Sequence, residues 1–162
     1  MMKKIISGGQ TGADRAALNF AIKRNIPHGG WVPKGRIAED GRIPDIYQLQ
    51  EMPTDSYPER TEQNVIDSDG TVIISHGVLT GGSANTAEMA RKHARPWLHL
   101  DMDKTTVDDA AQRQREWTTE NNIVVLNVAG PRQSRDSAIH DVTMKVLEMG
   151  VAKNQHGYAS RR

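Results

Sequence analysis

The sequence has 162 residues, about the size of one domain, and it contains no cysteine. Its 21 lysine and arginine residues and 20 aspartate and glutamate residues give a net charge of +1 at pH 7, so no uniform field attracts nucleic acid or an anionic membrane. The longest apolar runs, such as residues 123–126, are far shorter than the roughly 18 residues of a membrane helix, and the run after Lys4 is too short for a secretory signal. These features exclude disulfides, thiolate metal sites and a cysteine nucleophile, and they predict a cytoplasmic, single-domain protein without nucleic-acid or membrane partners.

The hydrophobic content is low for a domain of this size. Hydrophobic residues make up 36% of the chain, with a single phenylalanine and a mean hydropathy of −0.63. A domain of this length buries roughly 68–70% of the surface that its unfolded chain exposes. We therefore expect helices that pack closely through alanine, or subunits that share a core, and the composition favours a homo-oligomer.

Short apolar runs alternate with amphipathic stretches along the chain. In chain order, the pattern predicts a strand at residues 3–7, a helix at 11–24, a strand at 26–31, a helix at 59–67, a strand at 71–76, a helix at 85–93, a strand at 97–101, a helix at 107–120, a strand at 123–128 and a helix at 139–149. In the first helix, the apolar residues recur at the 3.6-residue period of one helix face. They are Ala13, Ala16, Ala17, Phe20 and Ala21.

Two segments interrupt this pattern. The segment from Pro33 to Pro58 is punctuated by proline and glycine, and we interpret it as a long functional loop with little regular structure. The end of the chain is polar, and we expect residues 153–162 to be frayed. We therefore predict one domain over residues 1–150, followed by a flexible tail over residues 151–162.

Alternating strands and helices are typical of an α/β fold. We expect a mostly parallel sheet of about five or more strands with helices on both faces. The strand around residues 123–126 is apolar at successive positions, as expected for a strand that is buried on both faces.

Glycine-rich turns follow several of the predicted strands. In an open α/β sheet, ligands bind at the carboxyl ends of the strands, so these turns are the predicted site. Glycine lets the backbone approach a ligand closely, and free amides at the start of a helix favour an anion such as phosphate. The candidate ligand-binding residues in these turns are Gly8, Gly9, Gln10, Thr11, Gly12, Asp14, Thr80, Gly81, Gly82, Ser83, Thr86, Gly130 and Arg132.

Each of these features also has a purely structural interpretation. A Gly-Gly pair after a strand is often only a tight turn, and neither the P-loop nor the G-x-G-x-x-G motif is present. Asp14 either complements the dipole of its helix or binds a ribose hydroxyl or a metal-bound water. Lys34, Arg36 and Arg132 either clamp phosphate oxygens or solvate their loops.

Two histidines and a tryptophan are further candidates. His28 and His76 both end strands, but two histidines without a third ligand at a recognisable spacing are more often structural, so we predict no metal site. Trp31 either stacks on a base or pterin ring or packs under the long loop.

Several motifs carry a family resemblance. The most specific is the run SGGQTGAD at residues 7–14. The other matching stretches are residues 27–31, 33–36, 38–41, 60–65, 68–71, 79–83, 86–88 and 127–132. With these motifs the chain resembles the family named for molybdenum carriers, the circularly permuted YpsA-like branch of the SLOG superfamily. The resemblance implies a Rossmann-like fold and a nucleotide-type ligand, with the molybdenum cofactor or a nucleotide as the bound molecule.

The same superfamily contains the LOG-type phosphoribohydrolases, to which the chain is more distantly similar. In their pattern an arginine precedes Ser-Asp and a glutamate follows a glycine-rich loop, and Arg60 and Glu88 stand at the corresponding places. Ala84 and Asn85 depart from that loop, where the pattern has glycine and threonine. This resemblance implies that Glu88 assists water attack at C1′ of a nucleoside monophosphate while Arg60 stabilises the developing charge.

Two functions therefore stand as hypotheses. In the first, the protein binds or carries a small phosphate-bearing ligand, such as a nucleotide or the molybdenum cofactor, through its glycine-rich loops. In the second, it is a nucleotide N-glycosidase that uses Arg60 and Glu88.

Overall fold

The computed structural model describes residues 1–153. Its elements in chain order are β1 (Lys4–Ile6), α1 (Ala13–Arg24), β2 (His28–Gly29), β3 (Trp31–Val32), β4 (Ile37–Ala38), β5 (Gly41–Arg42), β6 (Gln50–Glu51), α2 (Tyr57–Ile66), β7 (Gly70–Ser75), α3 (Gly81–Lys92), β8 (Trp97–Asp101), α4 (Val107–Glu120), β9 (Val125–Ala129) and α5 (Ile139–Gly150). The predicted tail over residues 153–162 falls almost entirely outside the described residues. Val151, by contrast, is buried in the core, so the packed part of the chain extends one residue beyond the predicted boundary.

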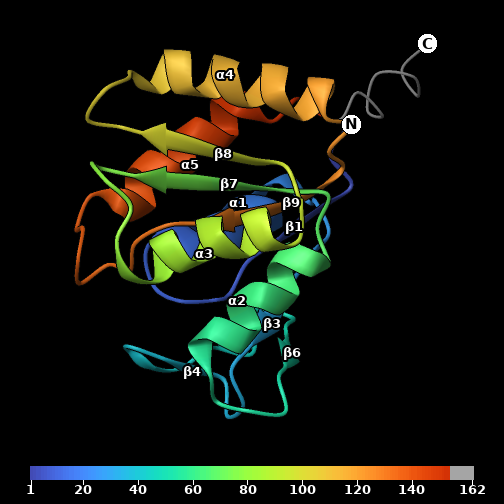
Figure 1. Ribbon diagram of the computed structural model, residues 1–162, viewed down its shortest axis with the longest axis vertical. Helices are drawn as coiled ribbons and strands as arrows, with labels where there is room; N and C mark the ends of the chain where they lie inside the picture. Colours follow the sequence, from blue (N-terminus) through green and yellow to red (C-terminus); the bar gives the residue numbers. More distant parts are fainter. Residues whose placement is uncertain (154–162) are drawn as a thin grey trace.

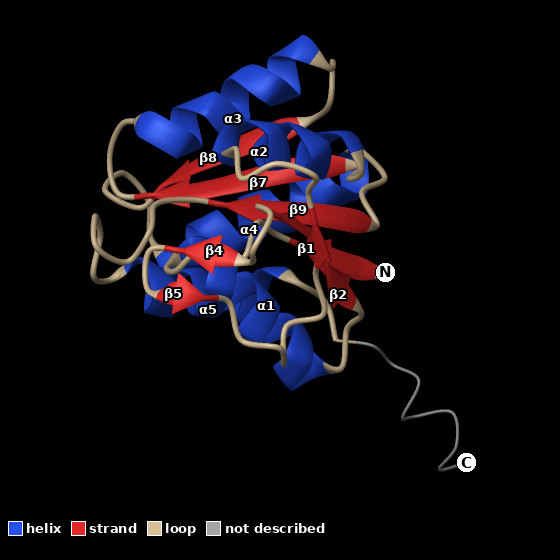
Figure 2. Cartoon of the chain, turned by 90° about the horizontal axis from the view of Figure 1, so that it is seen from below, coloured by secondary structure: helices blue, strands red, loops and turns tan. Residues whose placement is uncertain are grey.

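Five strands form one sheet in the order β2-β1-β9-β7-β8, and every pairing in it is parallel. Helices α1, α4 and α5 cover one face of this sheet, and α2 and α3 lie on the other (Figures 1 and 2). The predicted α/β fold, with a parallel sheet between two layers of helices, is therefore confirmed.

The strand order creates a point of divergence at the centre of the sheet. From β1 the chain passes through α1 to β2 at one edge, and from β7 it passes through α3 to β8 at the other edge. Strand β9 lies between β1 and β7. Because the two connections leave on opposite faces, a crevice opens at the carboxyl ends of these three strands, where ligands bind in open α/β sheets.

Helix α1 is the most deeply buried of the helices. The predicted apolar face of Ala13, Ala16, Ala17, Phe20 and Ala21 is fully buried, which confirms the expected close packing through alanine. Its opposite side is buried as well, because Leu18 packs in a second small cluster with Val32, Ile43 and Tyr47. These three residues come from the segment after β2, which folds over α1.

The proline-rich segment over residues 33–58 has little regular structure, as predicted. It contains a two-residue antiparallel hairpin, β4–β5, and the short strand β6, which pairs with β3. The segment is nevertheless firmly held. Glu39 accepts hydrogen bonds from Thr11 and from the backbone amide and hydroxyl of Ser134, and Asp40 pairs with Arg15 at 2.9 Å. The hairpin is thereby tied to the loops that follow β1 and β9.

Several predicted boundaries differ from the structure by two residues or more. The strand predicted at residues 26–31 is two strands in different sheets. The chain changes direction between them at Gly30, which has a φ of 131° and lies directly against the backbone of Ser7. Helix α3 begins at Gly81 rather than at residue 85. Strand β9 begins at Val125 rather than at residue 123, because the amides of residues 124 and 125 donate to the carboxylate of Asp69.

The close approach of the loop after β9 to the sheet yields a stability prediction. A Cβ on Gly130 would lie 2.3 Å from the carbonyl oxygen of Ile74 and 2.6 Å from the Cβ of Ala13, whereas a Cβ on Gly82 would meet no atom within 4 Å. We expect Gly130→Ala to lower the free energy of unfolding by roughly 1–3 kcal/mol through overpacking. The matched change Gly82→Ala, in the first turn of a helix, is expected to leave stability unchanged or slightly increased. Urea denaturation of both variants tests this, and equal effects at the two positions would contradict the packing argument.

Candidate functional site

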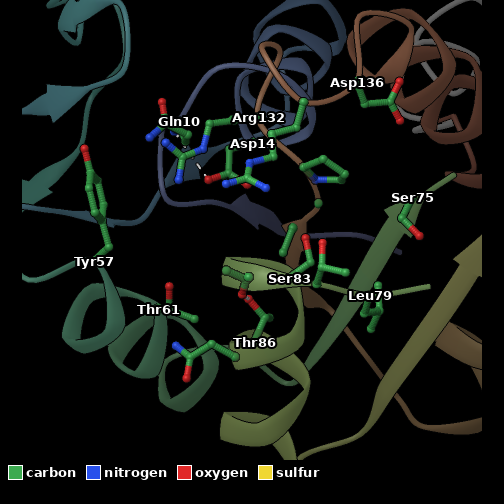
Figure 3. A pocket seen from close by; sticks show the side chains of 18 of the residues that line it. Gln10, Asp14, Tyr57, Thr61, Ser75, Leu79, Ser83, Thr86, Arg132 and Asp136 are labelled. Carbon is green, nitrogen blue, oxygen red and sulfur yellow. Dashed lines mark hydrogen bonds between the residues drawn. The ribbon is translucent and has the colours of Figure 1, made fainter. Parts of the chain in front are cut away.

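A cleft of about 990 Å³ occupies the crevice at the carboxyl ends of β1, β7 and β9. Its walls come from the loop after β1, the start of α2, the β7–α3 connection and the loop between β9 and α5. Figure 3 shows Gln10, Asp14 and Arg132 at one side of the cleft, with Thr61 on α2 and Thr86 on α3 across from them. The cleft therefore lies where the strand order predicts a ligand.

The N-terminus of α3 forms one wall of the cleft. Thr80 is the N-cap residue, but its side chain makes no capping hydrogen bond, and its carbonyl accepts the amides of Ser83 and Ala84 at 3.2 and 3.3 Å. The amides of Gly81 and Gly82 precede the first intrahelical bond and find no acceptor within residues 1–153. Gly81 has a φ of 51°, and neither glycine has a neighbouring atom within 4 Å of the Cβ position. Free amides, open space and the positive end of a helix dipole thus coincide.

Asp14 and Arg60 form a buried pair at the opposite wall. The side chains of Asp14 and Arg60 are only 7% and 11% exposed, and Arg60 Nη1 lies 3.7 Å from Asp14 Oδ2. The same oxygen accepts the amide of Gln10 at 3.3 Å. Arg60 fits because Gly8 has no side chain: a Cβ there would lie 2.1 Å from Nη1.

Burial raises the pKa of the Asp14 carboxyl to about 6, even though Arg60, the Gln10 amide and Arg15 act in the opposite direction. Burial also lowers the pKa of the Arg60 guanidinium, while Asp14 opposes that change. At pH 7 both groups are charged, and the carboxylate is held in its ionised form against an unfavourable desolvation free energy.

The remaining charged residues of the cleft come from the β9–α5 loop. Arg132 and Arg135 are exposed in the cleft, and neither forms an ion pair with any residue in the 1–153 range. Asp136 accepts the amide of Ala138 through one oxygen and contacts His76 Nδ1 at 2.6 Å through the other. With three arginines and two carboxylates among its lining residues, the cleft favours an anionic ligand.

The structure brings together most of the residues that the sequence predicted for ligand binding, together with the predicted catalytic residue Arg60. Those that line the cleft are Gln10, Asp14, Arg60, Thr80, Gly81, Gly82, Ser83, Thr86, Gly130 and Arg132. They come from three separate strand ends and from α2, as the crevice geometry requires.

Four of the predicted glycine-loop residues lie beside or beneath the cleft. Gly8 makes room for Arg60, and Gly9, with a φ of 71°, backs onto Val32 and Ile43. Thr11 and Gly12 line a second hollow of about 510 Å³, which also contains Glu39, Asp40 and Asp141. Gly12 has a φ of 82° and allows the start of α1 to approach the carbonyl of Pro131.

Three predicted charged residues lie outside the cleft. Arg36 is buried and donates to the carbonyls of Ile43, Pro44 and Tyr47, so it holds its own loop together. Lys34 is exposed on the same segment. Glu88 has a side chain that is 66% exposed and is paired with Arg91 one turn along α3, so Arg60 and Glu88 do not meet in this cleft.

The candidate tryptophan and histidines all have hydrogen-bond partners within the protein. Trp31 donates from its indole nitrogen to Asp67 at 2.6 Å and packs against α2 rather than in the cleft. His28 accepts the amide of Gln48, whereas His76 contacts Asp136. Within residues 1–153, no group of three or more histidine, aspartate or glutamate residues is arranged to hold a metal ion.

Several cleft residues were not predicted from the sequence. Arg135 and Asp136 follow the last strand by only a few residues, so extending the search past the glycine turn finds them. Tyr57 and Thr61 lie on α2, which does not follow a strand of the five-stranded sheet. No strand-end pattern indicates Tyr57, whereas Thr61 follows the predicted Arg60 within the matching stretch 60–65.

A comparison with protein families identifies residues 5–151 as a match to the model described as the circularly permutated YpsA SLOG family. The chain belongs to this family. The resemblance expected from the SGGQTGAD motif is thus confirmed over nearly the whole described chain.

A solved structure is closely similar. It is named "Putative molybdenum carrier protein", comes from Syntrophus aciditrophicus SB and is 60% identical to this chain. The match has a TM-score of 0.92 and covers 93% of this chain and 96% of the other. No curated protein matches the sequence. In the described part of the SLOG-family chain, none of the helices is both long and apolar enough to cross a bilayer.

The raised pKa of Asp14 gives a prediction about stability and pH. Because the folded pKa of about 6 exceeds the ordinary 3.8, the folded state binds more protons at Asp14 between about pH 4 and 6. The contribution of Asp14 to the free energy of unfolding therefore falls by about 3 kcal/mol as the pH rises through this window. Asn does not titrate, so we expect Asp14→Asn to become more stable relative to wild type as the pH rises from 4 to 7.

Urea denaturation at several pH values measures this difference. Asp108→Asn is the matched control, because Asp108 is also the second residue of its helix but is exposed. A stability difference between Asp14→Asn and wild type that stays constant with pH would refute the argument.

Proposed function

We propose that this protein binds a small phosphate-bearing ligand of nucleotide or pterin type in the cleft, as a carrier or binding protein. The observation that carries the proposal is the uncapped N-terminus of α3, where the amides of Gly81 and Gly82 are free and the space at both Cβ positions is open. A phosphate against these amides gains hydrogen bonds and the favourable end of the helix dipole.

The charges around this helix terminus support an anion at the same place. Arg132 and Arg135 line the cleft without ion-pair partners in residues 1–153, so their guanidinium groups are free to contact phosphate oxygens. The hydroxyls of Ser83 and Thr86 add donors on the α3 side, although Thr86 already donates to the carbonyl of Gly82.

The size of the cleft supports a ligand larger than phosphate alone. Its volume of about 990 Å³ lies at the upper end of the usual range for small-molecule sites, roughly 300–1,000 Å³. A nucleotide or a pterin phosphate fits such a volume with its ring system included.

The name of the similar Syntrophus protein suggests the molybdenum cofactor as cargo. The chain has no cysteine, and residues 1–153 offer no cluster of three metal-ligating side chains. The residues of the cleft therefore fit the organic part of such a cargo, through its phosphate and pterin ring. Binding through the phosphate is common to the cofactor and to ordinary nucleotides.

The geometry favours binding over N-glycosidic cleavage. The hydrolytic mechanism needs Glu88 beside Arg60, and Glu88 points away from the cleft in an exposed pair with Arg91. Binding needs the glycine-rich helix terminus and the arginines, and all of these line the cleft. We expect no release of free base when nucleoside monophosphates are incubated with the protein and analysed by chromatography. Release that disappears in Glu88→Gln would overturn this choice.

The central test places a side chain in the open space at the helix terminus. Gly82→Val introduces a branched side chain where no atom lies within 4 Å, so the fold is expected to tolerate it while the phosphate position is blocked. We expect at least a tenfold loss of affinity for AMP, GMP or neopterin monophosphate in isothermal titration, whichever of them binds, with little change in melting temperature without ligand. Unchanged affinity would place the phosphate elsewhere, and the absence of binding by every panel member to wild type would overturn the proposed function.

A second test removes one of the free cations. Arg132→Ala is expected to weaken binding of the same ligands about tenfold, and the loss is expected to shrink at high salt. Arg113→Ala is the control, because Arg113 is an exposed arginine on α4, outside the cleft. Equal effects of the two substitutions would show that only the net charge matters.

The homo-oligomer favoured by the composition stays a prediction. Sedimentation velocity of the purified protein measures the oligomeric state.

A further inference from the structure

The wall of the cleft opposite α3 holds a hydrogen-bond acceptor and a donor side by side. Asp14 reaches it from the first turn of α1 and Arg60 from α2, with Asp14 Oδ2 and Arg60 Nη1 3.7 Å apart. Both residues line the cleft, and both side chains are about nine-tenths buried. Charged groups in such a position are ordinarily fully hydrogen-bonded.

This pair is not fully hydrogen-bonded within residues 1–153. Asp14 Oδ2 accepts the Gln10 amide, but Asp14 Oδ1 has no partner in that part of the chain. Arg60 Nη1 donates to the hydroxyl of Thr61 at 3.3 Å, while Arg60 Nε is buried without any partner. The pair therefore retains Asp14 Oδ1, a second acceptor site on Asp14 Oδ2 and the terminal N–H groups of Arg60 for a ligand in the cleft.

An aromatic surface lies next to the pair. The guanidinium of Arg60 lies over the ring of Tyr57, 5.4 Å from its centroid, and Tyr57 also lines the cleft. Figure 3 shows Tyr57 at the edge of the cleft with its ring beside the space that Asp14 faces. A flat ligand ring gains stacking area on such a surface.

The arrangement is complementary to one particular ring edge. In 2-amino-4-oxopyrimidine rings, an oxo acceptor is followed by a ring N–H and an exocyclic amino group, which are two adjacent donors. A carboxylate accepts both donors at once, and a neighbouring guanidinium donates to the oxo group. Guanine and pterin share this edge. Hypoxanthine lacks the amino group, and adenine presents an acceptor where guanine presents the ring N–H.

We propose that Asp14 and Arg60 recognise the 2-amino-4-oxopyrimidine edge of the ligand, so that the cleft selects guanine nucleotides or pterin phosphates over hypoxanthine and adenine nucleotides. This inference rests on the proposed function, since the phosphate end of the same ligand lies at the N-terminus of α3. It assigns the phosphate of the ligand to one wall of the cleft and the ring to the other.

A ribose is the main rival as the partner of Asp14. Its two hydroxyls donate to a carboxylate equally well, but a diol needs neither the guanidinium donors of Arg60 nor the adjacent ring of Tyr57. The two ligands differ in a measurable way. Ribose recognition treats all bases alike and is lost with a 2′-deoxynucleotide, whereas edge recognition depends on the base and tolerates the deoxy sugar.

The experiment is isothermal titration of the wild-type protein with GMP, IMP, AMP, 2′-deoxy-GMP and neopterin monophosphate. We expect GMP or neopterin monophosphate to bind roughly 10- to 100-fold more tightly than IMP and AMP. IMP and AMP lack the 2-amino group, so one acceptor of the buried carboxylate stays unpaired when they bind. The tighter of GMP and neopterin monophosphate identifies whether the natural source of the edge is a guanine nucleotide or a pterin. Equal affinity for GMP, IMP and AMP overturns the inference, and loss of binding only with 2′-deoxy-GMP assigns Asp14 to ribose.

Two variants separate the two contacts. Asp14→Asn is expected to reduce the GMP-to-IMP affinity ratio to within about threefold, because a neutral amide no longer accepts both donors. Arg60→Lys, which keeps the charge but loses the planar fork, is expected to weaken GMP and IMP more than AMP, because only the first two carry the oxo group. Asp108→Asn, an exposed helix-start carboxylate, is expected to leave the ratios unchanged.

These outcomes distinguish the inference from the function on which it rests. If no panel member binds wild type, the proposed function fails. If all nucleotides bind with equal affinity and Gly82→Val abolishes that binding, the proposed function stands and the edge recognition fails. The selectivity of the wild-type protein alone decides the inference if the Asp14 and Arg60 variants do not fold.

Discussion

The convergence of the loops around the cleft depends on backbone positions that have no Cβ. At Gly12 an added Cβ would meet the carbonyl of Pro131, at Gly30 that of Ser7, and at Gly130 that of Ile74, each within 2.3 Å. These contacts hold the ends of β1, β7 and β9 and the start of α1 closer together than any other residue allows. Gly8 adds the space in which the Arg60 guanidinium lies. The shape of the cleft therefore depends on the absence of side chains at these four glycines, and the neighbouring side chains supply its chemistry.

The strand ends could be predicted from the sequence because their determinants are local. Apolar runs that end in Gly-Gly located Gln10, Gly81 and Gly82 in the cleft, since parallel strands bring their carboxyl ends to one edge. Charged residues could not be assigned by the same reasoning. Arg36 and Arg132 both follow glycine or proline in irregular segments, but the first satisfies main-chain carbonyls and the second faces the cleft. Only the folded path of the chain separates the two.

The phase of helix α3 explains why the Glu88 carboxylate lies outside the cleft. The buried side of α3 carries Ser83, Thr86, Ala87 and Ala90, and Glu88 is five residues after Ser83, about 140° around the helix. Because Gly81 and Gly82 are helical rather than part of a loop, this phase is fixed from the first turn onward. Tyr57 was missed for a different reason: α2 reaches the cleft from the far end of a long irregular segment, and only the family resemblance, through Arg60, points to that helix.

The two walls of the cleft place different demands on stability. The α3 wall requires little, because free amides at a helix start are solvated when no ligand is bound. The Asp14 wall is costly, because burial raises the pKa of the carboxyl to about 6 and the ionised form is present at pH 7 against that desolvation. A charge in such a position is difficult to explain by packing, since neutral residues fill space without the penalty. In the proposed complex, the N–H donors of the ligand ring take the place of the lost water at this carboxylate. In the proposed complex the phosphate and the ring engage separate walls, so substitutions at Gly82 and at Asp14 test separate contacts of the same ligand.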